Sequence, residues 1–582
     1  MKRLIYRVLG GVLLPVTMLL LAGCYRDLGN YDYTLGTMNE IKSVTFSPSA
    51  VVAADGNMIE VQQAMNEDDK TRRVEAFVEQ TLAKDINKLD FRWRRSFVDE
   101  NGKWVNDTIY TKGYLEFDLP VGVQMTYDVF LQIYDTTTDL SHYSSFKIKT
   151  RPLFKNSLFV LHGNEGARRV GNIEVIGEDT KIYTDVKSVT NDNNHYENVT
   201  GFGYTTYLNI PETLTNIGET NALTLYSNDG QTMAYDCHGM KERYTAEQMF
   251  KPLADNFAYR RTVQTGDPTN FTMYKVVLTD SGDVYVGNHV HALYKPGYGC
   301  ENNPDIPHQA DYKITAATIT HNRFIFWDAK HNRFLYSAKE GAGYALDEAS
   351  SIKKDLVLKN PLLDAGVKFN TLQKSPVGMT AVMGYINYRD NYSQQNAYFI
   401  FKDEATGDFY RYELLKMEIN DGSKARKQRA DGVEEEIQSA YNIIGEKKLT
   451  GLTPTDASTI TYNSWFTTTN LFFAQDGIVY RYNVSNGNKT IVYEAPQGYD
   501  VTMIKFRTEE SSSFSDDLGL YLNIVMFNGT NGAIGEIKFT NSADIDASYP
   551  ALFYDKDNNG NAWGKIKDIQ FVNDYVYKLK IQ

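Results

Sequence analysis

The feature that most constrains the fold of this chain is a β-hairpin that recurs along most of its length. In Phe472–Tyr482 an apolar strand is followed by an Asp-Gly turn and a Tyr-rich strand, and tight hairpin turns favour Asp-Gly. The pattern recurs at intervals of roughly 40–60 residues, about seven times in all, which is typical of four-stranded propeller blades. Further hairpins of this kind lie at 223–233, 276–286, 322–337, 398–412 and 521–539.

These hairpins predict that residues 151–582 form a β-propeller of about seven blades. The last strand-like segment, Val576–Ile581, has no partner after it in the sequence. We expect it to pair with Ser157–Leu161 and close the ring, because closure leaves no exposed sheet edge. Two or three β-sandwiches in series are the alternative fold.

Segment 413–450 interrupts the repeat. It contains a basic block at Lys424–Arg429, an acidic block at Glu434–Glu436 and a weakly helical stretch at Ile437–Leu449. Adjacent blocks of opposite charge are typical of a solvated loop. We therefore expect an insertion into the propeller, with a partner-binding segment as the alternative.

A smaller β-domain is expected at 38–150, where apolar and polar residues alternate with a period of two. About seven short strand-like segments favour an immunoglobulin-like sandwich, with Trp93 in its core. Aromatic residues make up 13% of the chain, and 41 of them are Tyr, a residue that suits strands. The predicted class is thus all-β, a sandwich followed by a propeller.

The N-terminus has the pattern of a secretory signal. Residues 1–23 combine three basic residues with an apolar run that is too short to span a bilayer. Leu21–Cys24 resembles a bacterial lipobox, and an ordinary signal with a chance Cys is the alternative. We predict lipidation of Cys24, a flexible leash at 24–37, and membrane contact through the lipid anchor only.

Sequence motifs for catalysis are missing. The chain has no G-x-S-x-G, H-E-x-x-H, P-loop or dinucleotide-binding motif, so no catalytic residue is predicted and an enzyme is the less favoured reading. Propeller enzymes nevertheless place their residues on separate blades, which leaves that reading open. The net charge of −13 argues against nucleic acid as a partner.

Two sets of residues have the chemistry of metal ligands. His289 and His291 lie two apart in a strand-like segment and would share a face, where imidazoles bind metal ions. Surface histidines are the alternative. Asp555, Asp557 and Asn559 resemble the first half of a calcium loop, although Ile566 stands where a Glu is needed. A polar hairpin turn is the favoured interpretation and no cofactor is expected, with calcium at this loop as the alternative.

The chain has three cysteines, Cys24, Cys237 and Cys300. An exported location permits a disulfide between Cys237 and Cys300, but sequence alone does not establish the geometry that a disulfide needs. The pair is therefore a candidate disulfide, with two separate thiols as the alternative.

Tyrosines are dense in two turn-rich stretches. Exposed rings could stack on sugars or pack against peptides, whereas most strand tyrosines simply pack between blades. The candidate ligand-binding residues are Tyr294, Tyr298, Tyr385, Tyr388 and Tyr392.

Two segments resemble a known family. Tyr127–Asp135 alternates in the manner of a late strand of PKD-type domains, and Cys24–Tyr33 reads CYRDLGNYDY after the lipobox. Together with the Tyr-rich propeller, they resemble PKD-like family lipoproteins of Bacteroidetes. That resemblance implies an outer-membrane, surface-exposed accessory of SusC/SusD-like importers. Few acidic residues follow Cys24, unlike the usual surface-export signals of that phylum.

Three functions are compatible with this sequence. The leading one is a lipoprotein that binds or presents oligomeric nutrient, glycan or peptide, to a SusC/SusD-like TonB-dependent importer. The second is a propeller lyase or glycoside hydrolase that acts on the same nutrient. The third is a scaffold that docks on the importer. Converging carboxylates or a His–Tyr–Arg group would indicate the enzyme, and an aromatic-rich surface without them the binder.

Overall fold

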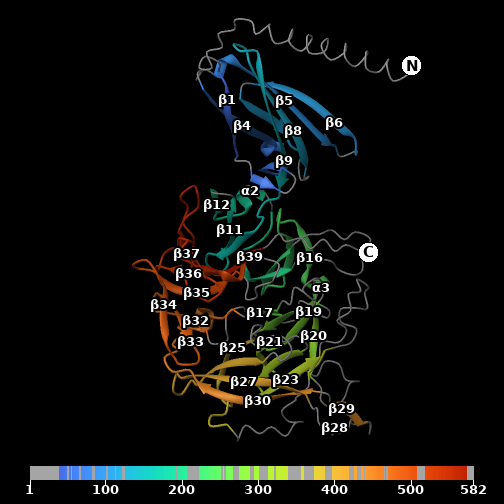
Figure 1. Ribbon diagram of the computed structural model, residues 1–582. Helices are drawn as coiled ribbons and strands as arrows, with labels where there is room; N and C mark the ends of the chain where they lie inside the picture. The colour runs from blue at the N-terminus through green and yellow to red at the C-terminus, as the bar shows by residue number, and fades with distance from the viewer. Residues whose placement is uncertain are drawn as a thin grey trace, which may run out of the picture. The chain divides into compact units, whose positions relative to one another are not determined.

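The structure is a computed structural model. It describes residues 39–572 except for several internal segments. The longer of these segments are 206–221, 266–273, 289–293, 300–311, 339–355, 359–371, 387–395, 419–424, 429–433 and 508–517. The described residues are mostly β-strands, so the predicted all-β class is confirmed (Figure 1). Among them, no helix combines the length and apolar character needed to cross a bilayer. The chain divides into two compact units, Met1–Arg151 and Pro152–Gln582.

The first unit consists of two sheets with an apolar core. One sheet has the order β1 (Ile41–Ser47), β4 (Thr71–Gln80), β7 (Tyr114–Asp118). The other has the order β2 (Val51–Ala53), β3 (Gly56–Gln62), β9 (Leu140–Arg151), β8 (Thr126–Asp135), β5 (Leu89–Val98), β6 (Trp104–Thr111). Trp93 is fully buried and packs edge-on against Phe146. Its predicted place in the core is confirmed.

The segment from Trp104 to Phe117 does not form one strand. It splits into β6, which pairs with β5, and β7, which pairs with β4 in the other sheet. Gly113 lies between them with φ of +75°, a backbone conformation that glycine adopts without steric cost. This glycine allows the chain to pass from one sheet to the other.

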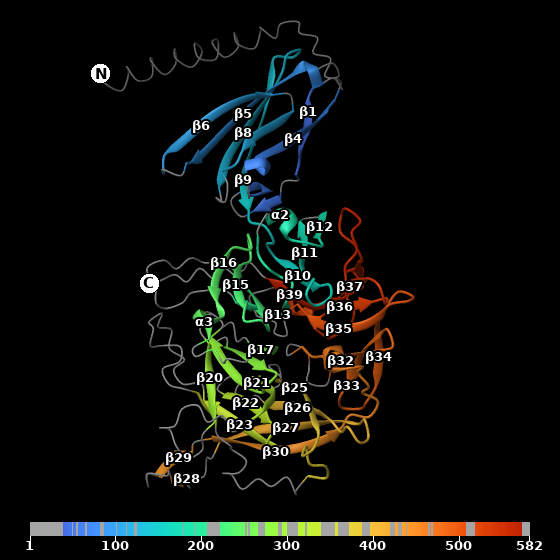
Figure 2. The same ribbon diagram turned by 180° about the vertical axis from the view of Figure 1, so that it is seen from behind.

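The second unit is a succession of sheets whose strands pair antiparallel, apart from β24, which is parallel to β20 (Figures 1 and 2). The first four comprise β10 (Ser157–His162) with β11 (Arg169–Ile176) and β12 (Asp179–Tyr183); β13 (Val199–Thr205), β14 (Ala222–Ser227), β15 (Met233–Asp236) and β16 (Glu242–Thr245); β17 (Tyr259–Thr265), β18 (Tyr274–Thr279), β19 (Val284–Asn288) and β20 (Tyr294–Gly299), joined by β24 (Leu356–Leu358); and β21 (Ile314–Ile319), β22 (Arg323–Asp328) and β23 (Arg333–Ala338).

Three further sheets complete the succession. They comprise β25 (Thr380–Ile386), β26 (Ala397–Lys402), β27 (Phe409–Glu418) and β30 (Ser439–Lys448); β31 (Ile460–Thr461), β32 (Asn470–Gln475), β33 (Ile478–Asn483) and β34 (Lys489–Glu494); and β35 (Asp500–Phe506), β36 (Tyr521–Phe527), β37 (Gly532–Lys538) and β38 (Leu552–Tyr554). The predicted hairpins are confirmed as neighbouring strands of these sheets, for example β32 with β33.

From the second sheet onward, apolar side chains join each sheet to the next. One cluster brings Phe472 of β32 against Phe506 of β35, and another brings Trp327 of β22 against Phe401 of β26. The last sheet also packs against the first, through Val525 of β36 and Val160 of β10. Successive sheets that pack face to face, with the last against the first, make the arrangement propeller-like.

The strand that joins the end of the chain to the beginning of this unit is β39 (Ile566–Val572). It pairs antiparallel with β10, from Ser157↔Val572 to His162↔Ile566. The sequence analysis identified the right partner but the wrong strand. Because β11 occupies the other edge of β10, no edge of β10 is left for Val576–Ile581, which lies outside the described residues.

The interruption at 413–450 contains more strand than predicted. The weakly helical stretch belongs instead to β30, which pairs with β27 from Tyr410↔Lys448 to Glu418↔Ser439. The two charged blocks form the hairpin of β28 (Ala425–Gln428) and β29 (Glu434–Ile437), in which Arg426 is opposite Glu436. Pairing with β27 outweighs the weak helical periodicity.

Candidate functional site

Tyr385 lies in the core rather than on a binding surface. It is 2% exposed and its ring stacks on that of Tyr398, with centroids 5.1 Å apart. Burial raises the pKa of its hydroxyl. No face of the ring is left for a ligand in this conformation, which corrects the prediction for this residue.

The structure does not describe the side chains of the other predicted ligand-binding tyrosines or of the two predicted metal-binding histidines. Tyr294 and Tyr298 lie on β20, but their side chains are outside what the structure describes. Tyr388, Tyr392, His289 and His291 fall in undescribed segments. Their roles stay predictions.

The predicted calcium loop is a turn that is closed by hydrogen bonds. The carboxylate of Asp557 accepts from the backbone N–H groups of Asn559 (2.9 Å) and Asn561 (2.8 Å) and from the hydroxyl of Thr184 (2.8 Å). Burial would raise the pKa of Asp557, but hydrogen bonds led by Asn561 hold it below its ordinary value. Within the described residues no group of three or more His, Cys, Asp or Glu side chains is placed to hold a metal ion. Calcium at Asp555, Asp557 and Asn559 stays a prediction.

Cys237 is fully buried at the end of β15. Its predicted disulfide partner, Cys300, lies outside the described residues. The disulfide therefore also stays a prediction.

The structure assembles a polar cluster where the last sheet meets the first. We call it the seam cluster and define it as Lys505, Arg507, Tyr521, Glu536, Tyr549, Asp568 and Phe571. The Nζ atom of Lys505 donates to the carbonyl of Ile569 (2.8 Å) and lies 3.6 Å from Oδ1 of Asp568. Lys505 belongs to β35 and Asp568 to β39, so this contact crosses from the last sheet to the first.

Arg507 forms the second cationic contact of the cluster. Its Nε and Nη2 donate to the two carboxylate oxygens of Glu536, at 2.9 Å and 2.8 Å, and Tyr549 donates to the same carboxylate at 2.7 Å. The Glu536 side chain is only 4% exposed. A buried carboxylate needs such partners, because an unpaired charge in the interior is costly.

Aromatic rings flank the guanidinium of Arg507. Its Cζ lies 4.1 Å from the ring centre of Tyr521 and 4.6 Å from that of Phe571. The ring of Tyr549 meets Tyr521 edge-on at 5.4 Å. Burial, and then the Glu536 carboxylate, raises the pKa of Tyr549 and raises that of Tyr554 to about 12. These phenols stay protonated at neutral pH, so they serve as hydrogen-bond donors rather than bases.

Asp568 extends the polar contacts to the second sheet. Its Oδ2 accepts from the backbone N–H of Phe202 on β13 at 2.8 Å. The hydroxyl of Tyr259 on β17 donates to the carbonyl of the same Phe202 at 3.2 Å. Polar contacts thus run across four successive sheets, from the last one to the third.

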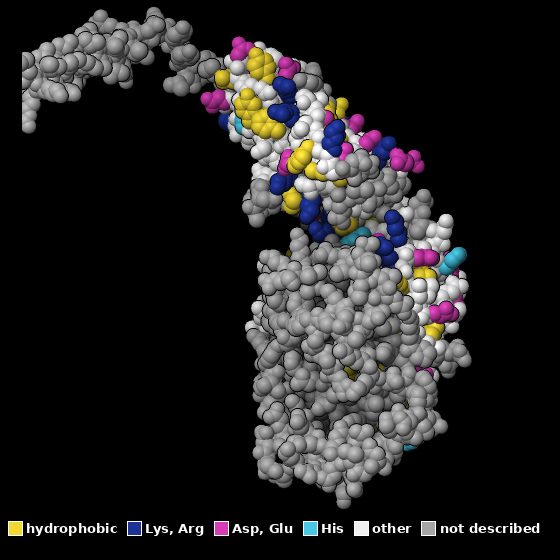
Figure 3. All heavy atoms as spheres, turned by 90° about the vertical axis from the view of Figure 1, so that its right-hand side faces the viewer, with side chains coloured by type: hydrophobic (Ala, Val, Ile, Leu, Met, Phe, Trp, Pro, Cys, Tyr) yellow, Lys and Arg dark blue, Asp and Glu magenta, His cyan; other side chains and the backbone are white. Residues whose placement is uncertain are grey.

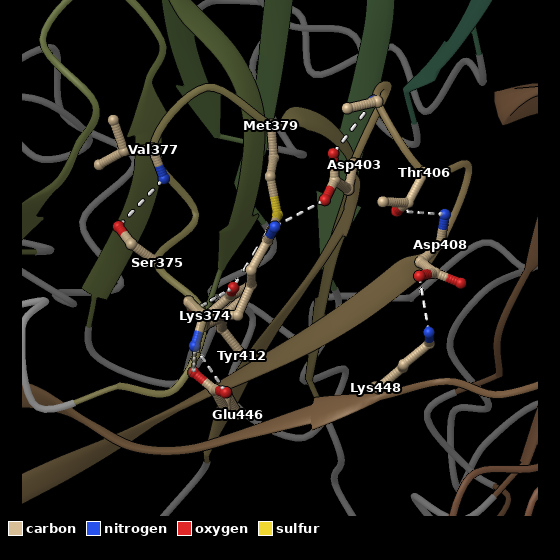
Figure 4. Close-up of polar contacts among 11 residues, drawn as sticks. Lys374, Ser375, Val377, Met379, Asp403, Thr406, Asp408, Tyr412, Glu446 and Lys448 are labelled. Carbon is tan, nitrogen blue, oxygen red and sulfur yellow. Dashed lines mark hydrogen bonds and ion pairs between the residues drawn. The ribbon is translucent and has the colours of Figure 1, made fainter.

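A second polar network surrounds the turn between β26 and β27 (Figure 4). Lys374 pairs with Asp403 at 2.8 Å and Lys448 with Asp408 at 2.6 Å. The Asp403 side chain raises the pKa of Lys374, and Lys374 in turn lowers that of Asp403. Tyr412 donates to the carbonyl of Lys374 at 2.7 Å. These contacts fasten the segment before β25 to the turn, which is a structural role.

The sequence analysis missed the seam cluster, although it left a trace. Lys505 and Arg507 flank Phe506 where β35 ends, and Glu536 interrupts the run of apolar and small residues 532–537 of β37. A charged residue in a buried strand needs a partner. The sequence does not reveal which strand supplies that partner, because β35 and β39 are far apart in the chain.

Comparison with known proteins bears on the N-terminal part of the chain. The model of the PKD-like family matches residues 24–201. This confirms the resemblance to that family over this range, which begins at the Cys predicted to be lipidated. No curated protein matches the chain.

Solved structures resemble the chain at low identity. A quinonprotein alcohol dehydrogenase-like protein from Bacteroides thetaiotaomicron is 10% identical with a TM-score of 0.37, over 88% of this chain and 96% of that one. BamB from Moraxella catarrhalis is 11% identical with a TM-score of 0.29, over 73% and 88% of the two chains. At these values the description of the fold rests on the strand pairing itself.

Proposed function

We propose that this protein is a lipid-anchored lipoprotein of the outer membrane that binds or presents oligomeric nutrient at the cell surface. Its partner in this proposal is a SusC/SusD-like TonB-dependent importer. The observation that carries the proposal is the match of the PKD-like family to residues 24–201, which begins at the lipobox Cys. A tethered binder raises the local nutrient concentration beside an importer, so even a weak site contributes.

The second unit supplies the binding body in this proposal. We propose that its successive sheets are the seven blades of a closed propeller, with β39 and β10 in the same blade. The seam cluster offers aromatic rings and donors, and its charged groups are already paired with one another. This chemistry favours binding over turnover, since no group of the seam cluster is set up as a nucleophile with an adjacent base.

Lipidation is tested by Cys24→Ala. We expect the variant to leave the outer-membrane fraction, because the acyl chains supply the membrane affinity. Fractionation of cells that express either form, followed by a high-salt wash, measures this. A variant that still sediments with the outer membrane would show that the anchor is not the lipid.

The role is tested by purification from native membranes, followed by incubation of the pure protein with the nutrient that induces its expression. We expect a SusC/SusD-like pair to co-purify and the nutrient to remain intact while it binds. Tyr521→Ala should weaken binding, whereas Lys448→Ala, in an exposed ion pair away from the seam cluster, should not. Cleaved nutrient would instead support the lyase or hydrolase. Importer binding without nutrient binding would support the scaffold.

A further inference from the structure

The six-stranded sheet of the first unit has an open face that carries aromatic and basic side chains. Phe130 on β8 is 39% exposed and Tyr143 on β9 is 56% exposed. Their ring centres lie 5.6 Å apart, with the planes tilted by 32°. Exposed aromatic pairs are unusual in a soluble domain, because burying such rings is favourable. Their position on an outer face points to a ligand.

Two arginines border this aromatic pair in the sheet. Arg94 on β5 is opposite Phe130 and Arg92 is opposite Gln132, which is itself opposite Tyr143. Both arginines are exposed, and the two-residue spacing puts them on one face. Figure 3 shows hydrophobic, basic and acidic side chains interspersed on this unit.

A hydrogen bond helps to hold the Tyr143 ring in place. The amide of Gln132 donates to the hydroxyl of Tyr143 (3.4 Å) and to Ser141 (3.1 Å). On the inner face of the same sheet, Trp93 and Leu131 are fully buried in the core. A rigid sheet that presents fixed rings loses little entropy on binding.

The size of the patch favours a small ligand over a protein. Adjacent strands are about 4.8 Å apart and residues i and i+2 about 7 Å apart, so the patch, on three strands and in two rows, spans roughly 10 by 7 Å between its outermost Cα positions. A stable protein interface needs about 800 Å² from each partner, several times this area. The neighbouring position along the sheet is occupied by the opposite charges Asp128 and Lys147, which are paired in register. The apolar area therefore does not extend further in that direction.

We propose that this face is a binding site for an acidic oligosaccharide. The rings of Phe130 and Tyr143 stack on the apolar faces of sugar units, and Arg92 and Arg94 pair with carboxylates carried by the same chain. Arginine suits this task, because its planar guanidinium bonds a carboxylate with two donors. The inference rests on the proposed role in nutrient capture and adds a second binding site to it, on the first unit, with a substrate class of its own.

The test uses the full mature chain and polygalacturonate, with uncharged dextran and dextran sulfate as comparison polymers. We expect polygalacturonate to bind in affinity electrophoresis and calorimetry, with at least tenfold weaker binding in Tyr143→Ala, Phe130→Ala and the double variant Arg92→Gln/Arg94→Gln. Phe77→Ala is the matched control, because Phe77 is an exposed aromatic (54%) on the other sheet of the same unit. Thermal melting confirms that each variant is folded.

Three outcomes would overturn the inference. One is no binding of polygalacturonate. Another is binding that the four substitutions leave unchanged. The third is equal binding of dextran sulfate that depends on the arginines but not on the rings, since this would be attraction to any polyanion. Each of these leaves co-purification with an importer unaffected, so failure here is distinguishable from failure of the proposed function.

Discussion

At the scale of single residues, several buried polar side chains in the second unit have specific partners. His162 on β10 is an example. Its Nδ1 accepts from the backbone N–H of Gly564 at 3.0 Å, and its Nε2 donates to the carbonyl of Thr184 at 2.6 Å. This pattern fixes one neutral tautomer, because a proton on Nδ1 would face the N–H of Gly564.

His162 should make stability depend on pH. Burial lowers the pKa of His162 in the folded protein, whereas in the unfolded chain the imidazole takes a proton below about 6.5. The unfolded chain then binds more protons, so the free energy of unfolding falls as the pH drops through 6.5, by at most about 1.4 kcal/mol per pH unit. Urea unfolding at pH 7.5 and 5.5 should show a smaller change for His162→Gln than for the wild type. His195→Gln is the control, since this histidine is exposed; an unchanged slope in His162→Gln would refute the argument.

The seam cluster should contribute strongly to stability through Arg507. Removal of this side chain in Arg507→Ala leaves the Glu536 carboxylate buried with Tyr549 as its remaining donor in the cluster. We expect a loss of about 3–5 kcal/mol in the free energy of unfolding, as for other broken buried pairs. Tyr549→Phe removes one neutral donor and should cost about 1–2 kcal/mol. Denaturant titration measures both, and equal losses would contradict this ranking.

At the scale of elements, the sequence predicted the parts that form through contacts between neighbouring residues. It did not predict the parts that form through contacts between residues far apart in the chain. Hairpins such as β32–β33 are local, so the alternating pattern and the Asp-Gly turn were enough to find them. The strand β30 was missed because β27, across an inserted hairpin, determines its conformation. The seam cluster was missed for the same reason, since Lys505 and Asp568 meet only in the folded protein. Tyr385 was misjudged because one sequence does not show which strand tyrosines face a neighbouring sheet.

The turn Asp557–Asn561 is held either by hydrogen bonds alone or by a bound calcium ion as well, and the two cases can be distinguished by experiment. Its Asn558 also accepts from the backbone N–H of Ile182 at 2.6 Å, so the turn fastens β12 as well. If these bonds alone hold it, 5 mM EDTA and added CaCl₂ at about the same concentration should leave the melting temperature unchanged, since only a bound ion would stabilise the fold by mass action. Asp557→Ala should lower stability by about 1–3 kcal/mol through its lost hydrogen bonds. A rise in melting temperature with CaCl₂ that Asp557→Ala abolishes would establish the calcium site.

At the scale of the whole molecule, each unit has its own apolar core and should unfold as a cooperative body. The first core includes Trp93, Leu131 and Ile148. The second unit is instead a series of clusters, each shared by two neighbouring sheets, and one of them joins the last sheet to the first. Its cooperativity should therefore depend on the packing of the last sheet against the first, to which β39 contributes Ile566, Ile569 and Phe571.

Two truncations separate the contribution of β39 from that of the residues that follow it. Removal of residues 566–582 deletes β39, exposes the edge of β10 and leaves Lys505 without its contacts to Ile569 and Asp568. We expect aggregation or a drop of at least about 10 °C in the melting of the second unit, because an open edge and an unpacked cluster are both destabilising. The transition of the first unit should remain, since none of its core residues is removed. Removal of residues 573–582 alone keeps β39 and should leave both calorimetric transitions near their original temperatures. If the shorter truncation is as damaging as the longer one, closure requires the residues after Val572; if neither is damaging, closure through β39 does not stabilise the second unit.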